Sequence, residues 1–199
     1  MCAAFTLAFL SVMKQEFSVE RVALGIDRRP SSPSMAAACA AAAADLGVTV
    51  DYYGVLPTPA VALQAMQDGI PAIVITGSHI PFDRNGIKFY RPDGEISKAD
   101  EQAILQAEVE VKPVQSVLPG ESARARQLYM ERYTQLFAPD LLQGKRIGLY
   151  EHSAAGRELN AEVLKKLGAE VISLGRTDTF VPIDTEAVSE EDQQQALAW

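Results

Sequence analysis

Short apolar runs alternate with helix-forming stretches along the first two thirds of the chain. Three runs are rich in β-branched and aromatic side chains, as strands are: residues 21–26, 48–56 and 70–76. Three stretches have helix-forming composition: residues 34–46, 58–68 and 97–111. Gly47 and Gly69 stand where helix ends are expected. This alternation predicts an α/β domain with a mixed, mainly parallel sheet.

The two ends of the chain differ from the alternating pattern between them. Residues 2–13 are apolar, but no positive residue precedes them and the run is too short to cross a bilayer, so we expect a buried helix. After a helix at 122–137, a strand–helix–strand pattern starts again at residue 145. We therefore predict a domain over residues 1–139 and the start of a second, similar α/β domain over residues 140–199.

Composition narrows the class of protein. Hydrophobic residues make up 48% and charged residues 22% of the 199 positions, which is typical of a globular protein. A formal net charge of −8 argues against a broad nucleic-acid or anionic-membrane surface. The two cysteines form no CxxC pair, which favours free thiols in a reducing compartment and hence a cytoplasmic protein.

The loop that follows the 70–76 strand carries the densest candidate chemistry. It reads TGSHIPFDRNGIK over residues 76–88, and it offers the hydroxyl of Ser78, the imidazole of His79 and the amine of Lys88. Ligands in open α/β sheets bind at the carboxyl ends of strands, which favours a functional loop. A solvated turn closed by Asn85 and Gly86 remains an alternative interpretation.

A second polar loop follows the 21–26 strand. Ser32 is placed to cap the next helix, whose first N–H groups could then meet an anion. The alternative is that Asp27 and Arg29 form an ion pair that only holds the loop. Phosphate-loop, dinucleotide-binding, nucleophile-elbow and zinc-helix motifs are absent from the sequence.

Three segments together resemble the α-D-phosphohexomutase family. They are GIDRRPSSP (25–33), GVLPTP (54–59) and TGSHIPFDRNGIK (76–88). The third follows the family pattern T-x-S-H-N-P, then N-G-x-K, except that Ile80 stands in place of Asn; Ile26 likewise replaces a common Arg. The match is strongest to the branch that acts on mannose phosphates. The resemblance implies a three-layer αβα first domain followed by the start of a second.

The resemblance also implies a mechanism. Ser78 would carry a phosphoryl group, exchange it with a hexose phosphate through a hexose 1,6-bisphosphate, and help bind Mg²⁺ through that phosphate. Lys88 would be the general acid/base, and His79 would orient the reacting groups. Arg29 and Asn85 would support the loop or the substrate.

Family members have four domains, so the resemblance implies an N-terminal fragment. An opening strand would precede it, and an Asp-rich metal loop would follow residue 199. We therefore expect the chain alone to be inactive. Alternatives are a phosphoglucomutase, a phosphoglucosamine mutase or a non-catalytic phosphosugar-binding module. A serine hydrolase is disfavoured, because the neighbouring Ser78 and His79 point apart on an extended loop and lack an evident carboxylate partner.

Overall fold

A five-stranded mixed sheet forms the centre of the first unit. The computed structural model describes residues 1–77, 80, 83–112, 117–181 and 188–199. In the order β2-β1-β3-β4-β5, the strands are Thr49–Val55, Arg21–Ile26, Ala72–Ile75, Ile87–Arg91 and Gly94–Glu95. β1 is parallel to β2 and to β3, whereas β4 is antiparallel to both β3 and β5. The mixed α/β sheet predicted from the sequence is confirmed.

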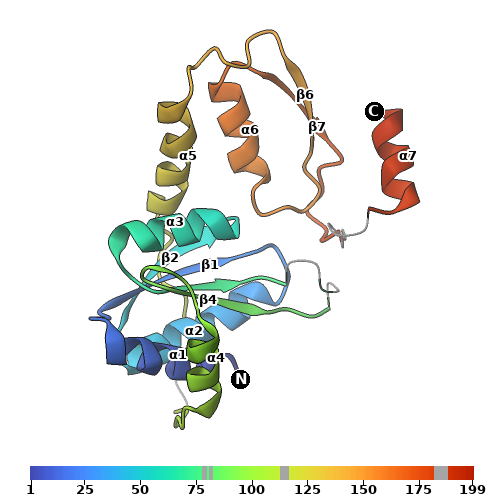
Figure 1. Ribbon diagram of the computed structural model, residues 1–199. Coiled ribbons are helices and arrows are strands. Elements are labelled where there is room, and N and C mark those ends of the chain that lie inside the picture. The colour runs from blue at the N-terminus through green and yellow to red at the C-terminus, as the bar shows by residue number, and fades with distance from the viewer. Residues whose placement is uncertain (78–79, 81–82, 113–116, 182–187) are drawn as a thin grey trace.

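Helices cover both faces of this sheet (Figure 1). α1 (Cys2–Glu16), α2 (Ser32–Asp45) and α4 (Lys98–Gln106) lie on one face; α3 (Thr58–Asp68) lies on the other, with α5 (Arg124–Leu136) beside it. Successive residues of a strand point to opposite faces. Accordingly, Val22 and Leu24 pack with α1 and α2, whereas Ala23 packs with α3. The three-layer αβα arrangement is confirmed.

The ends of two helices differ from the expectation. α2 begins one residue after Ser31, which is its N-cap, so Ser32 is not the cap; its hydroxyl donates to Asp27 instead. α4 ends at Gln106 rather than at residue 111, because Ala107 has extended backbone angles (φ −66°, ψ 123°). Val109 lies in the extended segment beyond the helix, where successive side chains point to opposite sides, and it packs against the core. Both sequence-based expectations were wrong.

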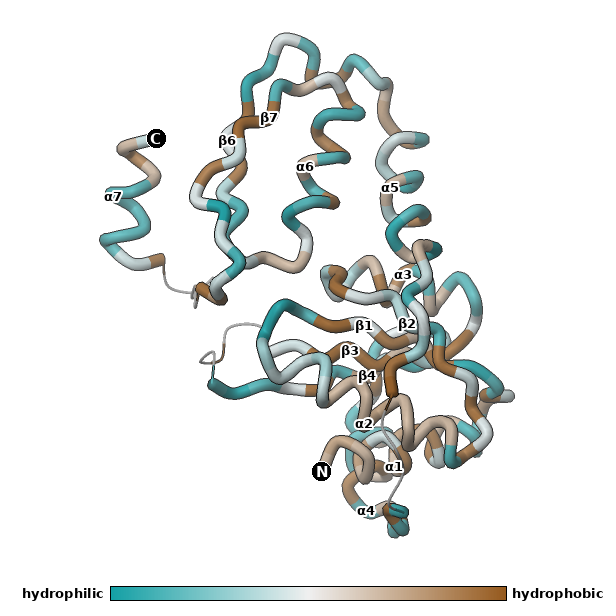
Figure 2. Tube along the Cα trace, turned by 180° about the vertical axis from the view of Figure 1, so that it is seen from behind, coloured by the Kyte–Doolittle hydropathy of each residue, from teal (hydrophilic) through white to brown (hydrophobic). Residues whose placement is uncertain are grey.

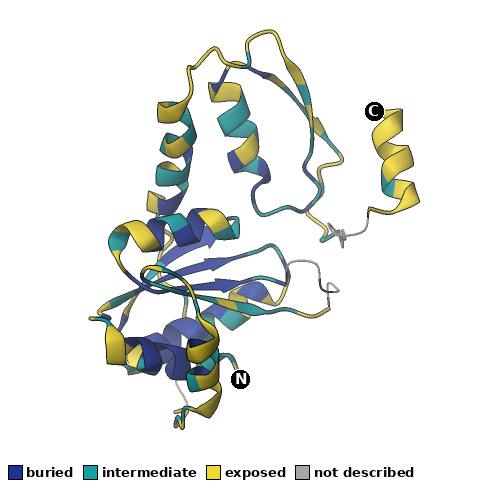
Figure 3. Cartoon of the chain, in the orientation of Figure 1, coloured by how far each residue is buried: buried dark blue, intermediate teal, exposed yellow. Residues whose placement is uncertain are grey.

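The second unit is a two-stranded parallel sheet with a helix on it. β6 (Arg146–Tyr150) pairs with β7 (Glu170–Leu174), and α6 (Arg157–Lys166) connects them. Leu159 of α6 belongs to the same apolar cluster as Ala23 of β1, so the two units share a core. α7 (Glu190–Ala198) is hydrophilic along most of its trace and none of its residues is buried (Figures 2 and 3). The boundary at residues 139/140 stays a prediction.

Both cysteines are free thiols, as expected. Cys39 is buried, and burial raises the pKa of its thiol to about 11, so it is protonated at neutral pH. Among the helices that the structure describes, none combines the length and the apolar character that a membrane crossing requires.

Candidate functional site

The loops after β1 and β3 meet at one edge of the main sheet. β1 and β3 run parallel and end at Ile26 and Ile75, so the segments that follow them lie side by side. The backbone N–H of Asp27 donates to the carbonyl of Ile75 at 2.9 Å, which joins the two strand ends directly. The predicted site residues Ser78 and His79 lie outside the described residues. Their neighbours Gly77 and Ile80 belong to the described part of the chain.

The Asp27 carboxylate holds these loops together. Its Oδ1 accepts hydrogen bonds from the backbone N–H of Arg29 at 3.0 Å and from the Ser32 hydroxyl at 2.5 Å. Its Oδ2 accepts from the N–H of Gly77 at 3.3 Å and lies 3.5 Å from the Arg29 Nε. The ion pair that the sequence left as an alternative is therefore present. The same carboxylate also binds Gly77 of the segment over residues 76–88, which we call the serine loop.

Asn85 closes the other side of the loop. Its Nδ2 donates to the hydroxyls of Ser31 and Ser32 at 3.0 and 2.8 Å, and its Oδ1 accepts from the N–H of Gly86 at 2.9 Å. Within the described residues, both polar ends of the side chain are thus bonded to protein atoms. These bonds join the segment before β4 to the start of α2, and the role that the resemblance implies for Asn85 stays a prediction.

Arg29 lies beneath the serine loop. The residue is only 2% exposed, and its Nη2 donates to the carbonyl of Ile80 at 2.9 Å. Gly77 is required by this contact, because a Cβ on it would lie 2.4 Å from the Arg29 Cζ. The guanidinium therefore touches the backbone on both sides of residues 78–79. Arg29 is therefore buried against the backbone at Gly77 and Ile80, and the supporting role that the resemblance implies for it stays a prediction.

Lys88 lies on β4 opposite Val74 of β3. Its neighbours Ile87 and Phe89 pack against the α1–α2 core, so Lys88 shares the α3 face of the sheet with Val74. The residue is exposed. This is also the face against which the second unit packs. Its distance to Ser78 involves a residue that the structure does not describe and stays a prediction.

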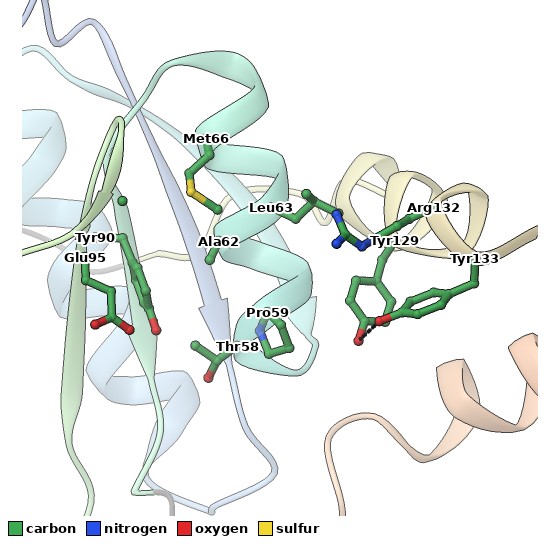
Figure 4. Close-up of a pocket in the computed structure, with 11 residues that line it drawn as sticks. Thr58, Pro59, Ala62, Leu63, Met66, Tyr90, Glu95, Tyr129, Arg132 and Tyr133 are labelled. Atoms are coloured by element: carbon green, nitrogen blue, oxygen red, sulfur yellow. Dashed lines mark hydrogen bonds between the residues drawn. The ribbon is translucent and has the colours of Figure 1, made fainter. Parts of the chain in front are cut away.

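A separate pocket of about 430 Å³ lies between α3, α5 and the β4–β5 hairpin (Figure 4). Leu63, Tyr90 and Arg132 line it, together with a tyrosine pair in which the Tyr133 hydroxyl donates to that of Tyr129 at 3.1 Å. Burial first, and then this hydrogen bond, raise the pKa of Tyr129 to about 12. In the described part of the chain, the lining includes none of the predicted site residues.

The described residues do not form a metal site by themselves. Over residues 1–77, 80, 83–112, 117–181 and 188–199, no three His, Cys, Asp or Glu side chains come together as ligands. Mg²⁺ requires several oxygen ligands in near-octahedral geometry. The residues that the structure places at the sheet edge therefore do not fit a magnesium site on their own.

Sequence reasoning missed the contacts between this edge and the second unit. Arg28 bonds Glu158, which is 130 positions away, and the Arg29 guanidinium lies over the ring of Phe180. Arg28 stands in a polar loop that the sequence singles out, but nothing in the sequence pattern indicates either partner.

Comparison with known proteins identifies the family. Residues 1–112, more than half of the chain, match the family described as phosphoglucomutase/phosphomannomutase, alpha/beta/alpha domain I. The three-layer αβα fold agrees with that description. The chain belongs to the phosphoglucomutase/phosphomannomutase family.

Individual relatives carry two names. The phosphomannomutase of Salmonella muenchen is 57% identical over 199 residues, which is all of this chain and 41% of that protein. The phosphomannomutase of Sinorhizobium fredii is 44% identical over 185 residues, or 89% of this chain and 39% of that protein. The phosphoglucosamine mutase of Thermus thermophilus is 35% identical over 159 residues, or 78% and 36%. The chain thus spans about two fifths of the length of these relatives.

Solved structures agree on the fold. A phosphoglucomutase/phosphomannomutase family protein from Burkholderia thailandensis superposes with a TM-score of 0.72 at 24% identity, covering 99% of this chain and 45% of that one. A second structure, from Thermus thermophilus, gives a TM-score of 0.80 at 19% identity, covering 99% and 46%. At these identities the likeness supports the fold alone.

We expect Asp27→Asn to lower the free energy of unfolding by about 1–3 kcal/mol. With either orientation of the new amide, its NH₂ group faces an N–H donor, of Gly77 on one side or of Arg29 on the other. Urea unfolding followed by circular dichroism measures the change. Asp140→Asn, in an exposed turn before β6, serves as the control and is expected to change stability by less than about 0.5 kcal/mol. Equal losses in both variants would contradict the role of Asp27.

Proposed function

We propose that this chain, completed to its relatives' length, is a phosphomannomutase that interconverts mannose 6-phosphate and mannose 1-phosphate. The observation that carries the proposal is the alignment of the whole chain to a phosphomannomutase at 57% identity. The identity to a phosphoglucosamine mutase is lower, at 35%. Phosphoglucosamine mutase is the second candidate, because relatives with that name align over most of the chain. Comparing kcat/KM for the two sugar phosphates decides between them.

In the proposed reaction, phosphorylated Ser78 gives its phosphoryl group to the free hydroxyl of a hexose phosphate. The Oγ–P bond breaks, a new O–P bond forms on the sugar, and a hexose 1,6-bisphosphate results. After that intermediate turns over in the site, its other phosphate returns to Ser78. Lys88 acts as general acid/base, which requires reach to the reacting hydroxyl. His79 orients the reacting groups, while Arg29 and Asn85 hold the loop.

Mg²⁺ belongs to the proposal only as a cofactor of the longer protein. Among the described residues no ligand set comes together, and the family resemblance implies that an Asp-rich loop of the longer protein would supply the remaining ligands. A cytoplasmic location is proposed as well, which the two free thiols support.

Ser78 is expected to carry the phosphoryl group. After the longer protein is incubated with hexose 1,6-bisphosphate, intact-mass and peptide analysis is expected to place one phosphoryl group on Ser78. Ser78→Ala is expected to lower turnover by several orders of magnitude, because no nucleophile remains at that position. Ser34→Ala, which changes an exposed serine of α2, is the control and is expected to leave turnover unchanged. Phosphate found on another residue alone would reject the assignment.

Lys88→Met is expected to lower kcat on the order of 100- to 10,000-fold without unfolding the domain, as loss of a general acid/base does. Lys88 is exposed on β4, so replacing it removes an amine and no core contact. Lys98→Met, at the exposed start of α4, is the matched control. Steady-state kinetics and thermal melting measure both effects. An unchanged kcat for Lys88→Met contradicts the role.

The 199-residue chain alone is expected to show no mutase turnover and only weak Mg²⁺ binding. Its β6–β7 sheet pairs just two strands in the described residues, and open strand edges promote self-association. An assay with mannose 1-phosphate, Mg²⁺ and hexose 1,6-bisphosphate tests turnover, titration calorimetry tests Mg²⁺ binding, and light scattering gives the mass in solution. Turnover like that of an ordinary enzyme would contradict the need for further ligands.

A further inference from the structure

The loop after β1 is bonded to the second unit of the chain. The Arg28 Nη2 donates to both carboxylate oxygens of Glu158, at 3.0 and 2.9 Å, and its Nε donates to the carbonyl of Ala154 at 3.3 Å. Glu158 lies in the first turn of α6, where the helix dipole favours a negative charge. Hydrogen bonds between charged groups are stronger than neutral ones, so this contact fixes the loop to α6.

Glu158 is the shared acceptor of a cluster of arginines. Its Oε1 also accepts from the Arg157 Nε at 3.0 Å and the Arg176 Nη2 at 2.8 Å. Burial raises the pKa of Glu158, but the Arg157 hydrogen bond and the charges of Arg28 and Arg157 outweigh it and lower the pKa to about 2. Glu158 is therefore ionised at neutral pH, and its negative charge is available to Arg28.

A second contact leads from the second unit to the serine loop. The Arg29 Cζ lies 4.7 Å from the centre of the Phe180 ring, a distance at which a guanidinium is attracted to an aromatic face. The same guanidinium is the one that meets Gly77 and donates to Ile80. Phe180 thus touches the group that supports the backbone around residues 78–79.

We propose that Phe180 and Glu158 are positioning residues, through which the second unit sets the geometry of the serine loop. Phe180 acts through Arg29 and Glu158 acts through Arg28, and these two arginines are neighbours in one loop that Asp27 ties to Gly77. This inference rests on the proposed function for its catalytic consequence. Neither residue touches substrate in the proposal; each controls where the loop stands.

The test replaces the ring and then restores it. Phe180→Leu keeps an apolar side chain but removes the aromatic face, whereas Phe180→Tyr keeps the face. In the 199-residue chain, hydrogen exchange of the Gly77 and Ile80 amides is expected to quicken about fivefold in Phe180→Leu and to stay at the wild-type rate in Phe180→Tyr. An unchanged rate in Phe180→Leu, or the same increase in both variants, overturns the inference.

A second pair of variants tests the ion pair. Arg28→Gln removes the charge that faces Glu158 and is expected to quicken the same amides. Arg146→Gln, which removes an arginine from an exposed pair with Glu170 in the second unit, is the control and is expected to have no effect. Arg28 and Phe180 act on one loop. The free-energy change for exchange of these amides in the double variant is therefore expected to be smaller than the sum of the changes in the two single variants. Full additivity would overturn the common path.

Kinetics in the longer protein give the catalytic readout. Phe180→Leu is expected to lower kcat about tenfold while KM changes less than about twofold, and Phe180→Tyr is expected to restore kcat. Hydrogen exchange does not depend on activity. If exchange responds but the wild-type protein has no mutase activity, the proposed function fails and the loop coupling stands. If the protein is active and exchange does not respond, the coupling fails and the function stands.

Discussion

The site depends on one carboxylate that serves two loops at once. Parallel pairing of β1 with β3 brings the loop ends to one edge, but pairing alone does not fix the loops beyond it. Asp27 accepts from Arg29 and Ser32 in its own loop and from Gly77 in the serine loop. A half-buried carboxylate with several donors is strongly held, and each donor restricts the others. The backbone that enters residues 78–79 is therefore positioned by Asp27.

Close packing between Arg29 and Gly77 also restricts the loops at this sheet edge. Arg29 is buried against Gly77, where no side chain fits, so the guanidinium and the loop backbone have to move together. The cost of burying an arginine is offset by its ion pair with Asp27, its bond to Ile80 and the Phe180 ring. Because the ring belongs to the second unit, the loop is stabilised by contacts that the first unit cannot supply by itself.

The sequence predicted those helix ends that depend only on residues close together in the chain. Gly69 ends α3 in a left-handed conformation where the sequence predicts a helix end, and Ser97, the first residue of the predicted 97–111 stretch, caps α4. The position of Ser32 before a helix predicts a cap, but position alone does not reveal that its hydroxyl donates to Asp27 instead. The contacts of Arg28 and Phe180 could not be predicted, because they join segments more than a hundred residues apart and carry no periodic pattern.

The cationic side chains near this sheet edge differ in whether a carboxylate already neutralises them. The proposed substrate, a hexose phosphate, is anionic, so under that proposal it would have to meet cations that are not already neutralised. Arg28 is committed to Glu158 and Arg29 to Asp27, which leaves both poorly suited to bind a phosphate. Lys88 is exposed on the α3 face, next to the same edge. In a chain of net charge −8, local placement of such a cation has to overcome the overall repulsion of an anion. The two loop arginines are therefore bound up in contacts within the protein, and under the proposed function the exposed amine of Lys88 would be a group that attracts the substrate.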